Sequence, residues 1–222
     1  GAVFMQEVPR FFAVLDERGI DILCSDGTHP PDIDTAEVFA FQEQSCSLSS
    51  TTEGEIPLCW NDSTCSKLGA HWLRCAAPHC GVAIERDASF WKWRYSSVPG
   101  TFEYRVFGDD LRGYVVARVE MIGGETSEQR AEGRDHVHGP SHGSALRIVE
   151  CLPSSARAWR GGCDKDFAAL LRGVCVWAMC EHGVCVADFW CSSTRFYRTM
   201  RVAGVHRQTP ALGVLSPKQE AR

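Results

Sequence analysis

With 222 residues, the chain is long enough to bury one substantial hydrophobic core and to carry a small appendage. Hydrophobic residues make up 44% and charged residues 23%, which excludes a disordered or a membrane-embedded protein as a description of the whole chain. A net charge of −5 without a basic run argues against a nucleic-acid partner. No stretch approaches the roughly 18 apolar residues that a membrane-spanning helix requires, and the first residues given do not form a basic segment followed by an apolar one. We therefore expect a cytoplasmic protein with no membrane partner.

The first quarter of the chain changes character twice. Residues 7–18 place apolar side chains at helical spacing before a glycine, which predicts a helix followed by a short strand at 20–24. Residues 25–55 are rich in Pro, Asp, Ser and Thr, which predicts a linker. We expect residues 1–58 to be a helix–strand segment plus linker from a preceding unit of a longer protein, and 59–222 to form the main domain.

The next segment is predicted to be mainly helical. Residues 60–74 suit a helix, and residues 82–84 suit a short extended piece. Residues 86–95 interleave aromatic and basic side chains, a composition that can stack on bases. Because the chain is acidic and has no second basic patch, a helical turn that buries the aromatic side chains is favoured. The side chains expected to be buried are Phe90, Trp91 and Tyr95.

A β-hairpin is predicted next, with strands at residues 102–107 and 114–121. The second strand alternates an apolar with a mixed face, as expected for a strand covered on one side. Residues 123–144 are polar and carry three histidines, which predicts a solvated loop, with a metal cluster as the alternative. These histidines are His136, His138 and His142.

The last third of the chain alternates strands and helices. Residues 146–152 form a predicted strand, and residues 153–162 a turn. Asp164 can cap the following helix by accepting from an amide of its first turn, and Gly183 can end it. Residues 184–191 form the next strand. A last helix follows, with Ser193 or Thr194 as its cap and Gly204 at its end.

This order resembles the GNAT superfamily of acyl-CoA-dependent N-acetyltransferases over roughly residues 80–208. The resemblance rests on the segment 86–95 before the hairpin, on the strand at 145–152, and on the run ADFWCSS at 187–193 that leads into the last helix. It is strongest for bacterial members that carry two GNAT-type units in tandem. The implied fold is α/β (α+β), with a mixed, splayed central sheet flanked by helices.

The resemblance implies acetyl-CoA or another acyl-CoA as cofactor. In the family, the pantetheine lies between the splayed fourth and fifth strands, and the following turn holds the pyrophosphate at a helix N-terminus. Here the arginines and glycines of that turn miss the family spacing, and Asp164 adds a negative charge. The residues expected to line the cofactor are Val149, Cys151, Leu152, Arg157, Arg160, Gly161, Gly162 and Ser193.

The catalytic residues follow from the same resemblance. Glu150 on the fourth strand is the expected base, with Glu120 as the second candidate. The family often places a tyrosine acid four residues before the closing glycine, where this chain has Met200. Tyr197, one turn earlier, is the expected substitute, and its alternative role is aromatic packing on the sheet.

The twelve cysteines are expected to be mostly reduced, because the chain shows no sign of secretion. Cys175, Cys185 and Cys191 fall in apolar stretches and are expected to pack in the core. We expect no metal site. The only local set dense enough for zinc comprises Cys59, Cys65, Cys75, His79 and Cys80.

Three functions remain open from the sequence. The first is an acyl-CoA-dependent N-acyltransferase that acts on a small-molecule or peptide amine. The second is a catalytically inactive GNAT-like interaction module, and the third is a zinc-stapled binding domain. A second copy of the chain or a second GNAT-type unit is the expected protein partner.

Overall fold

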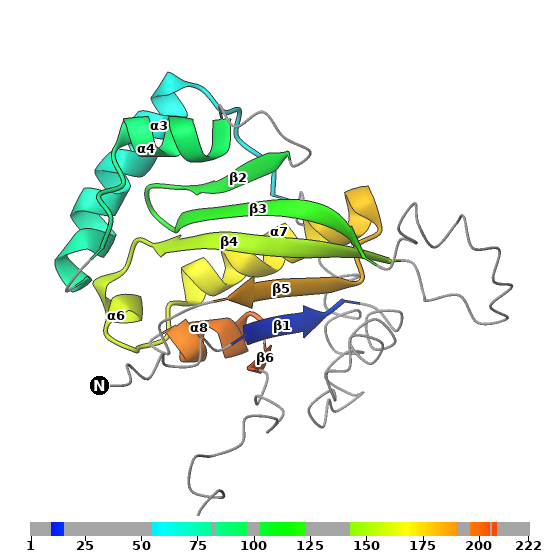
Figure 1. Ribbon diagram of the computed structural model, residues 1–222. Coiled ribbons are helices and arrows are strands. Elements are labelled where there is room, and N and C mark those ends of the chain that lie inside the picture. Colours follow the sequence, from blue (N-terminus) through cyan, green and yellow to red (C-terminus); the bar gives the residue numbers. More distant parts are fainter. Residues whose placement is uncertain are drawn as a thin grey trace, which may run out of the picture.

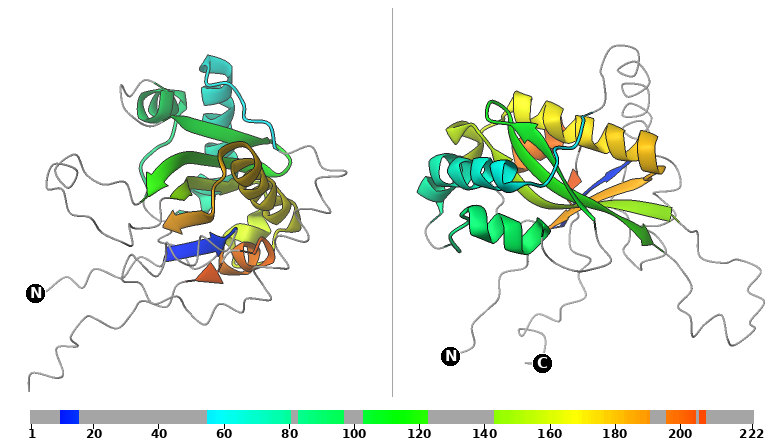
Figure 2. Two further views of the ribbon diagram at one scale, coloured as in Figure 1. Left: turned by 90° about the vertical axis from the view of Figure 1, so that its right-hand side faces the viewer. Right: turned by 90° about the horizontal axis from the view of Figure 1, so that it is seen from above.

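The computed structural model describes residues 10–15, 55–80, 83–96, 103–122, 143–190, 196–204 and 206–207. Its strands form one six-stranded sheet in the order β2-β3-β4-β5-β1-β6. All neighbouring strands are antiparallel except β4 and β5, which run parallel. Helices lie on both faces of this sheet (Figures 1 and 2). The expected α/β (α+β) class with a mixed sheet is confirmed.

One face of the sheet is covered by α3 (Asp62–His71), which runs into a π-helical turn at Trp72–Ala76, and by α4 (Ala88–Trp91). Both helices begin with a side-chain cap. The Asn61 side chain accepts from the amide of Thr64, and that of Asp87 from the amide of Phe90. The predicted helix at 60–74 and the helical turn at 86–95 are thus confirmed. Trp91 and Tyr95 are buried, and Phe90 is partly buried against the core.

The hairpin consists of β2 (Tyr104–Asp109) and β3 (Gly113–Ile122), and β4 (Gly143–Pro153) pairs along the other edge of β3. In the turn, the Asp109 carboxylate accepts from the amides of Leu111 and Arg112. These bonds explain why the acidic turn closes tightly. The predicted strands are confirmed in kind, although residues 123–142 lie outside the described residues.

The opposite face is covered by α7 (Lys165–His182), which contacts β2, β3 and β4. Asp164 accepts from the amide of Phe167, and Gly183 adopts the left-handed conformation at φ 60°. Both predicted ends of this helix are therefore confirmed. The next strand, β5 (Val186–Trp190), lies between β4 and β1 in the sheet.

The N-terminal prediction was wrong in one respect, because residues 10–14 form a strand and not part of a helix. This strand, β1 (Arg10–Val14), pairs with β5 on one side and β6 on the other. Ala13, Val14 and Leu15 are all buried, as in a strand enclosed on both faces. A short apolar run fits helical and strand spacing alike, so only the tertiary pairing decides. Residues 16–54, with the predicted strand and linker, lie outside the described residues.

The last helix, α8 (Tyr197–Val202), starts later than expected. Its N-cap is Phe196, which provides no side-chain cap, so the prediction of Ser193 or Thr194 as the cap was wrong. Residues 191–195 lie outside the described residues. A two-residue strand, β6 (His206–Arg207), completes the sheet.

The core lies between the sheet and its helices. Its largest fully buried side chains include Trp91, Phe107, Phe167 and Met200. Between β4 and α7, a short helix, α6 (Ala156–Trp159), fills part of the predicted turn. Within the described ranges, no helix is long and apolar enough to cross a membrane.

Candidate functional site

The central feature of the site is the point where the described parallel pairing of β4 and β5 ends, which we call the parting. Among the described residues, the parallel pairing covers Ala145–Ile148 of β4 against Val186–Phe189 of β5, which ends at Trp190, whereas β4 stays paired with β3 as far as Pro153. The β3–β4 register shifts at this point, so that Val149 is an extra residue in β4. Such a β-bulge bends a strand, and bulges are common next to active sites. The predicted pantetheine-lining residues Val149, Cys151 and Leu152 lie beyond the parting.

Glu150 follows the bulge and lies on the sheet face that α3 and α4 cover. Its carboxylate pairs with the guanidinium of Arg86, and the hydroxyl of Tyr95 donates to its Oε1 atom at 2.7 Å. The Glu150 side chain is 13% exposed. The predicted base therefore sits at the parting, but each of its oxygens already accepts a hydrogen bond.

Arg86 is positioned by its neighbours. Its guanidinium lies 4.6 Å from the centre of the Trp72 ring, and its carbonyl accepts from the indole N–H of Trp91 at 2.9 Å. A guanidinium over an aromatic face gains cation–π attraction while it stays planar toward a carboxylate. The Arg86–Glu150 pair thus ties the segment before α4 to the bulged part of β4.

Tyr95 keeps its proton. Burial, followed by the charge of Glu150 beside it, raises the pKa of the Tyr95 hydroxyl. The ring stacks on Trp60 at 5.8 Å and on Trp91 at 5.6 Å. A cavity of about 390 Å³ opens beside Tyr95, and the residues that line it include Trp60, Tyr104 and the ion pair of Glu103 and Arg105.

The second candidate base, Glu120, belongs to a chain of ion pairs across three strands. It lies between Arg118 on β3 and Arg147 on β4, and Arg147 also pairs with Asp188 on β5. The Asp188 side chain is 1% exposed, and that of Glu120 is 17% exposed. Both candidate bases, Glu120 and Glu150, are therefore ion-paired carboxylates.

The turn after β4 is held by hydrogen bonds between its own backbone groups. Gly161 adopts a positive φ of 84°, and a Cβ on Gly162 would overlap the Arg157 side chain. The amides of Arg160 and Gly162 donate to the carbonyl of Arg157, and that of Gly161 to Ala158. These predicted cofactor residues lie together, but the amides of Arg160, Gly161 and Gly162 already donate to carbonyls within the turn.

Asp164 occupies the N-terminus of α7. Its Oδ1 atom accepts from the amide of Phe167 at 3.0 Å, and its own amide donates to the hydroxyl of Thr199 on α8 at 3.1 Å. The Oδ2 atom is buried and accepts no hydrogen bond from the described residues. A carboxylate therefore occupies the helix N-terminus at which an anionic ligand would otherwise be favoured.

The last helix, α8, contains two of the three remaining positions singled out from the sequence, Tyr197 and Met200. Tyr197 is the first residue of α8, and Met200 has no exposed surface. Phe196, directly before α8, packs against Trp159 of α6 with the ring centres 4.8 Å apart. The start of α8 therefore lies beside the turn that follows β4. Ser193 lies outside the described residues.

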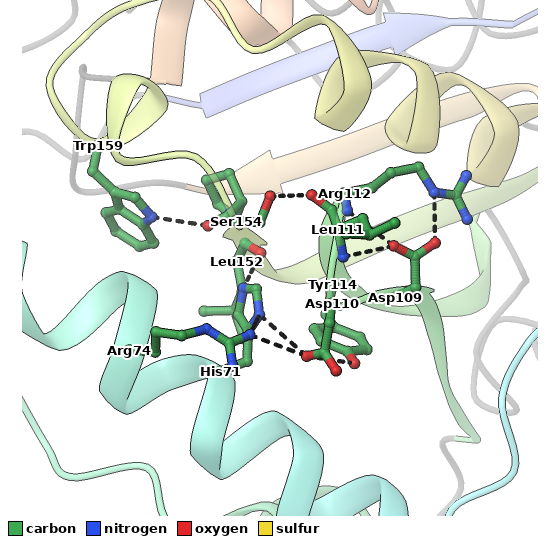
Figure 3. A network of polar contacts seen from close by, with 11 residues as sticks. His71, Arg74, Asp109, Asp110, Leu111, Arg112, Tyr114, Leu152, Ser154 and Trp159 are labelled. Atoms are coloured by element: carbon green, nitrogen blue, oxygen red, sulfur yellow. Dashed lines mark hydrogen bonds and ion pairs between the residues drawn. The ribbon is translucent and has the colours of Figure 1, made fainter.

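His71 was missed by the sequence reasoning and binds the same end of β4 from α3. Figure 3 shows it between Arg74, Asp110 and Leu152. Its Nε2 atom is 3.0 Å from the carbonyl of Leu152, which can only accept, so Nε2 carries the proton. Burial lowers the pKa of His71, against the opposing effect of this carbonyl. Its role in this network is to hold α3 to β4 as a neutral imidazole.

The set of Cys59, Cys65, Cys75, His79 and Cys80, which was the alternative to the expected absence of a metal site, is not brought together around one point. Cys65 is buried in the core and Cys59 is exposed. Among the described residues, no three His, Cys, Asp or Glu side chains are grouped to hold a metal ion. Cys175 and Cys185 are buried, as expected for apolar packing, and Cys191 lies outside the described residues.

No protein-family model, no curated protein sequence and no solved structure matches this chain. The fold and the site geometry therefore carry the functional argument.

Proposed function

We propose that this protein is an N-acyltransferase of the GNAT type, which moves an acyl group from a pantetheine thioester, as in acyl-CoA, to an amine. The observation that carries the proposal is the parting of β4 and β5 at the bulged residue Val149. Where two parallel strands separate, their backbone groups become available to an extended ligand. Pantetheine is such a ligand, because it is a chain of amides that can pair like a strand.

The chemistry then needs a proton acceptor near the parting. Glu150 lies one residue beyond the bulge, and an ionised carboxylate has about four lone-pair positions, two of which are used by Arg86 and Tyr95. The amine nitrogen attacks the thioester carbonyl and loses its proton to Glu150 while the carbon–sulfur bond breaks. Amides of β4 would stabilise the oxyanion, and Tyr197 is the proposed acid for the thiolate.

The acceptor amine is proposed to enter from the cavity beside Tyr95. Trp60 and Tyr104 give this cavity aromatic walls, and the Tyr95 hydroxyl links it to Glu150. Aromatic walls with a few polar groups at the edge are typical of small-molecule sites. A small amine, or the amine-bearing end of a peptide, fits this description.

A second candidate function is a GNAT-like interaction module without catalysis. It is favoured by the ion pairs at Glu150 and Glu120, and by the buried methionine at position 200. Paired carboxylates are weaker proton acceptors than isolated ones, because a nearby cation stabilises the ionised form. The two candidates differ in whether amide product forms.

Calorimetric titration with S-acetyl-pantetheine and with acetyl-CoA tests donor binding. We expect a saturable heat for the pantetheine thioester, and an absence of heat with both donors at millimolar concentration overturns the proposal. Product formation with a panel of amines then separates the candidates. Loss of product in Glu150→Gln with donor binding retained supports catalysis, whereas binding without any product supports the interaction module.

A further inference from the structure

One corner of the molecule carries a group of exposed cations. It is formed by α6, the start of α7 and α8, which lie together in both Figure 1 and Figure 2. None of these cations forms an ion pair with a described residue. In α6, the first turn of α7 and α8, Asp166 is the only exposed acid among the described residues. We call this the basic corner, and it comprises Arg157, Arg160, Lys165, Arg198 and Arg201.

The basic corner is held together by specific contacts. The Trp159 and Phe196 rings join α6 to α8, and Thr199 of α8 bonds to the amide of Asp164 and the carbonyl of Gly162. Figure 1 shows the C-terminal ends of β4 and β5 directed toward this corner. A ligand that runs between the parted strands therefore leaves the protein here.

The corner is poorly suited to the diphosphate of a free CoA molecule. The backbone amides that would bind it already donate within the protein, and the buried Asp164 carboxylate repels an anion at the start of α7. Arg157 also covers Gly162, where the backbone would have to approach the phosphate. The amides already used belong to Arg160, Gly161, Gly162, Asp164 and Phe167.

We propose that the acyl group arrives on the phosphopantetheine arm of an acidic carrier protein, which docks on the basic corner. This inference rests on the proposed acyltransfer function. CoA and carrier proteins present the same thioester arm, but a carrier protein replaces the nucleotide by a protein surface. Cations spread over three elements match carboxylates spread over such a surface, and steer its approach although the whole chain has a net charge of −5.

The reaction balances without a further reactant. The carbon–nitrogen bond of the amide forms and the carbon–sulfur bond of the thioester breaks. The proton of the amine goes to the base, and the thiolate on the carrier arm takes up a proton. The products are the amide and the carrier protein with a free thiol.

The test compares three donors by titration at low and high salt: an acidic acyl carrier protein charged with acetyl-phosphopantetheine, acetyl-CoA and S-acetyl-pantetheine. We expect the carrier to bind at least about tenfold more tightly than acetyl-CoA, and to weaken as salt rises. Arg160→Glu should lower carrier binding by about tenfold or more and leave S-acetyl-pantetheine binding unchanged. Lys67→Glu on α3, an exposed residue with the same charge change, is the matched control and should leave all three unchanged.

The outcomes separate the two proposals. If acetyl-CoA binds as tightly as the carrier and Arg160→Glu weakens both, the corner binds nucleotide phosphates, and carrier docking is overturned while acyltransfer stands. Carrier binding no tighter than that of S-acetyl-pantetheine overturns carrier docking in the same way. If neither S-acetyl-pantetheine nor acetyl-CoA binds at millimolar concentration, the proposed function itself fails.

Discussion

Two charged regions flank the parting of β4 and β5, and they are built differently. Around Glu150 the cation and the carboxylate meet in a partly buried ion pair, supported by stacked aromatic rings. In the basic corner, five cations are exposed and have no ion pair with any described residue. Buried, paired charges are costly to break, whereas exposed and unpaired ones hardly affect stability. The first region therefore holds the fold at the site, and the second remains available for a partner.

The largest effect on stability is expected at the paired region. Glu150→Ala leaves the Arg86 guanidinium and the Tyr95 hydroxyl without their acceptor, which should cost about 2 kcal/mol of unfolding free energy. Glu150→Gln keeps one acceptor oxygen and should cost about half as much. Urea unfolding measures both. Equal stability of Glu150→Ala and the unchanged protein would show that this pair contributes nothing.

Asp164 lies at the start of α7 within the basic corner, and substitutions there distinguish the effect of a helix cap from that of a negative charge. Asp164→Ala removes the acceptor for the amide of Phe167 and should cost about 1 kcal/mol of unfolding free energy. Asp164→Asn keeps the cap, so its stability should stay within about 0.5 kcal/mol. Because the variant also removes the buried negative charge, acetyl-CoA should bind to it more tightly. Unchanged acetyl-CoA affinity would contradict the role given to this carboxylate.

The lowered pKa of His71 predicts how the stability of the protein changes in acid. Burial lowers the pKa of the folded imidazole, while in the unfolded chain it titrates near its usual value of about 6.5. Below about pH 6.5 the unfolded state therefore binds the proton and the folded state does not, so stability falls as the pH drops toward the folded pKa.

The measurement is the melting temperature between about pH 7.5 and about pH 5. His71→Gln keeps a donor for the carbonyl of Leu152 but does not titrate, so its profile should be flatter than that of the unchanged protein. Parallel profiles would show that His71 does not govern this part of the pH dependence.

The smallest stability effects are expected in the basic corner. Arg160→Ala and Arg201→Ala remove exposed side chains without an ion pair to the described residues, and each should change unfolding free energy by less than about 0.5 kcal/mol. The same variants should weaken carrier binding. A large loss of stability in either variant would place that arginine among the structural charges, and remove the contrast between the two regions.

Local signals explain what the sequence predicted well. Asp87 and Asp164 cap helices through amides three residues away, Gly183 ends α7, and Asp109 closes the hairpin turn within three residues. Each signal acts over a few residues, so the order of elements follows from spacing, whereas the mixed sheet was implied only by the resemblance to the GNAT superfamily. The placement of residues 10–14 failed because its deciding contacts are with β5 and β6, far along the chain.

The site shows the same division. The sequence alone determined that an acid, Glu150, stands on the strand beside the expected cleft, and that an acid precedes the helix after it. Only the tertiary structure decided that Arg86 and Tyr95, 64 and 55 residues away, occupy that carboxylate, and that Val149 bulges where β4 leaves β5. The physical reason is that a cap or a turn is fixed by nearby backbone geometry. The partner of a buried charge is instead set by which distant elements the core brings together.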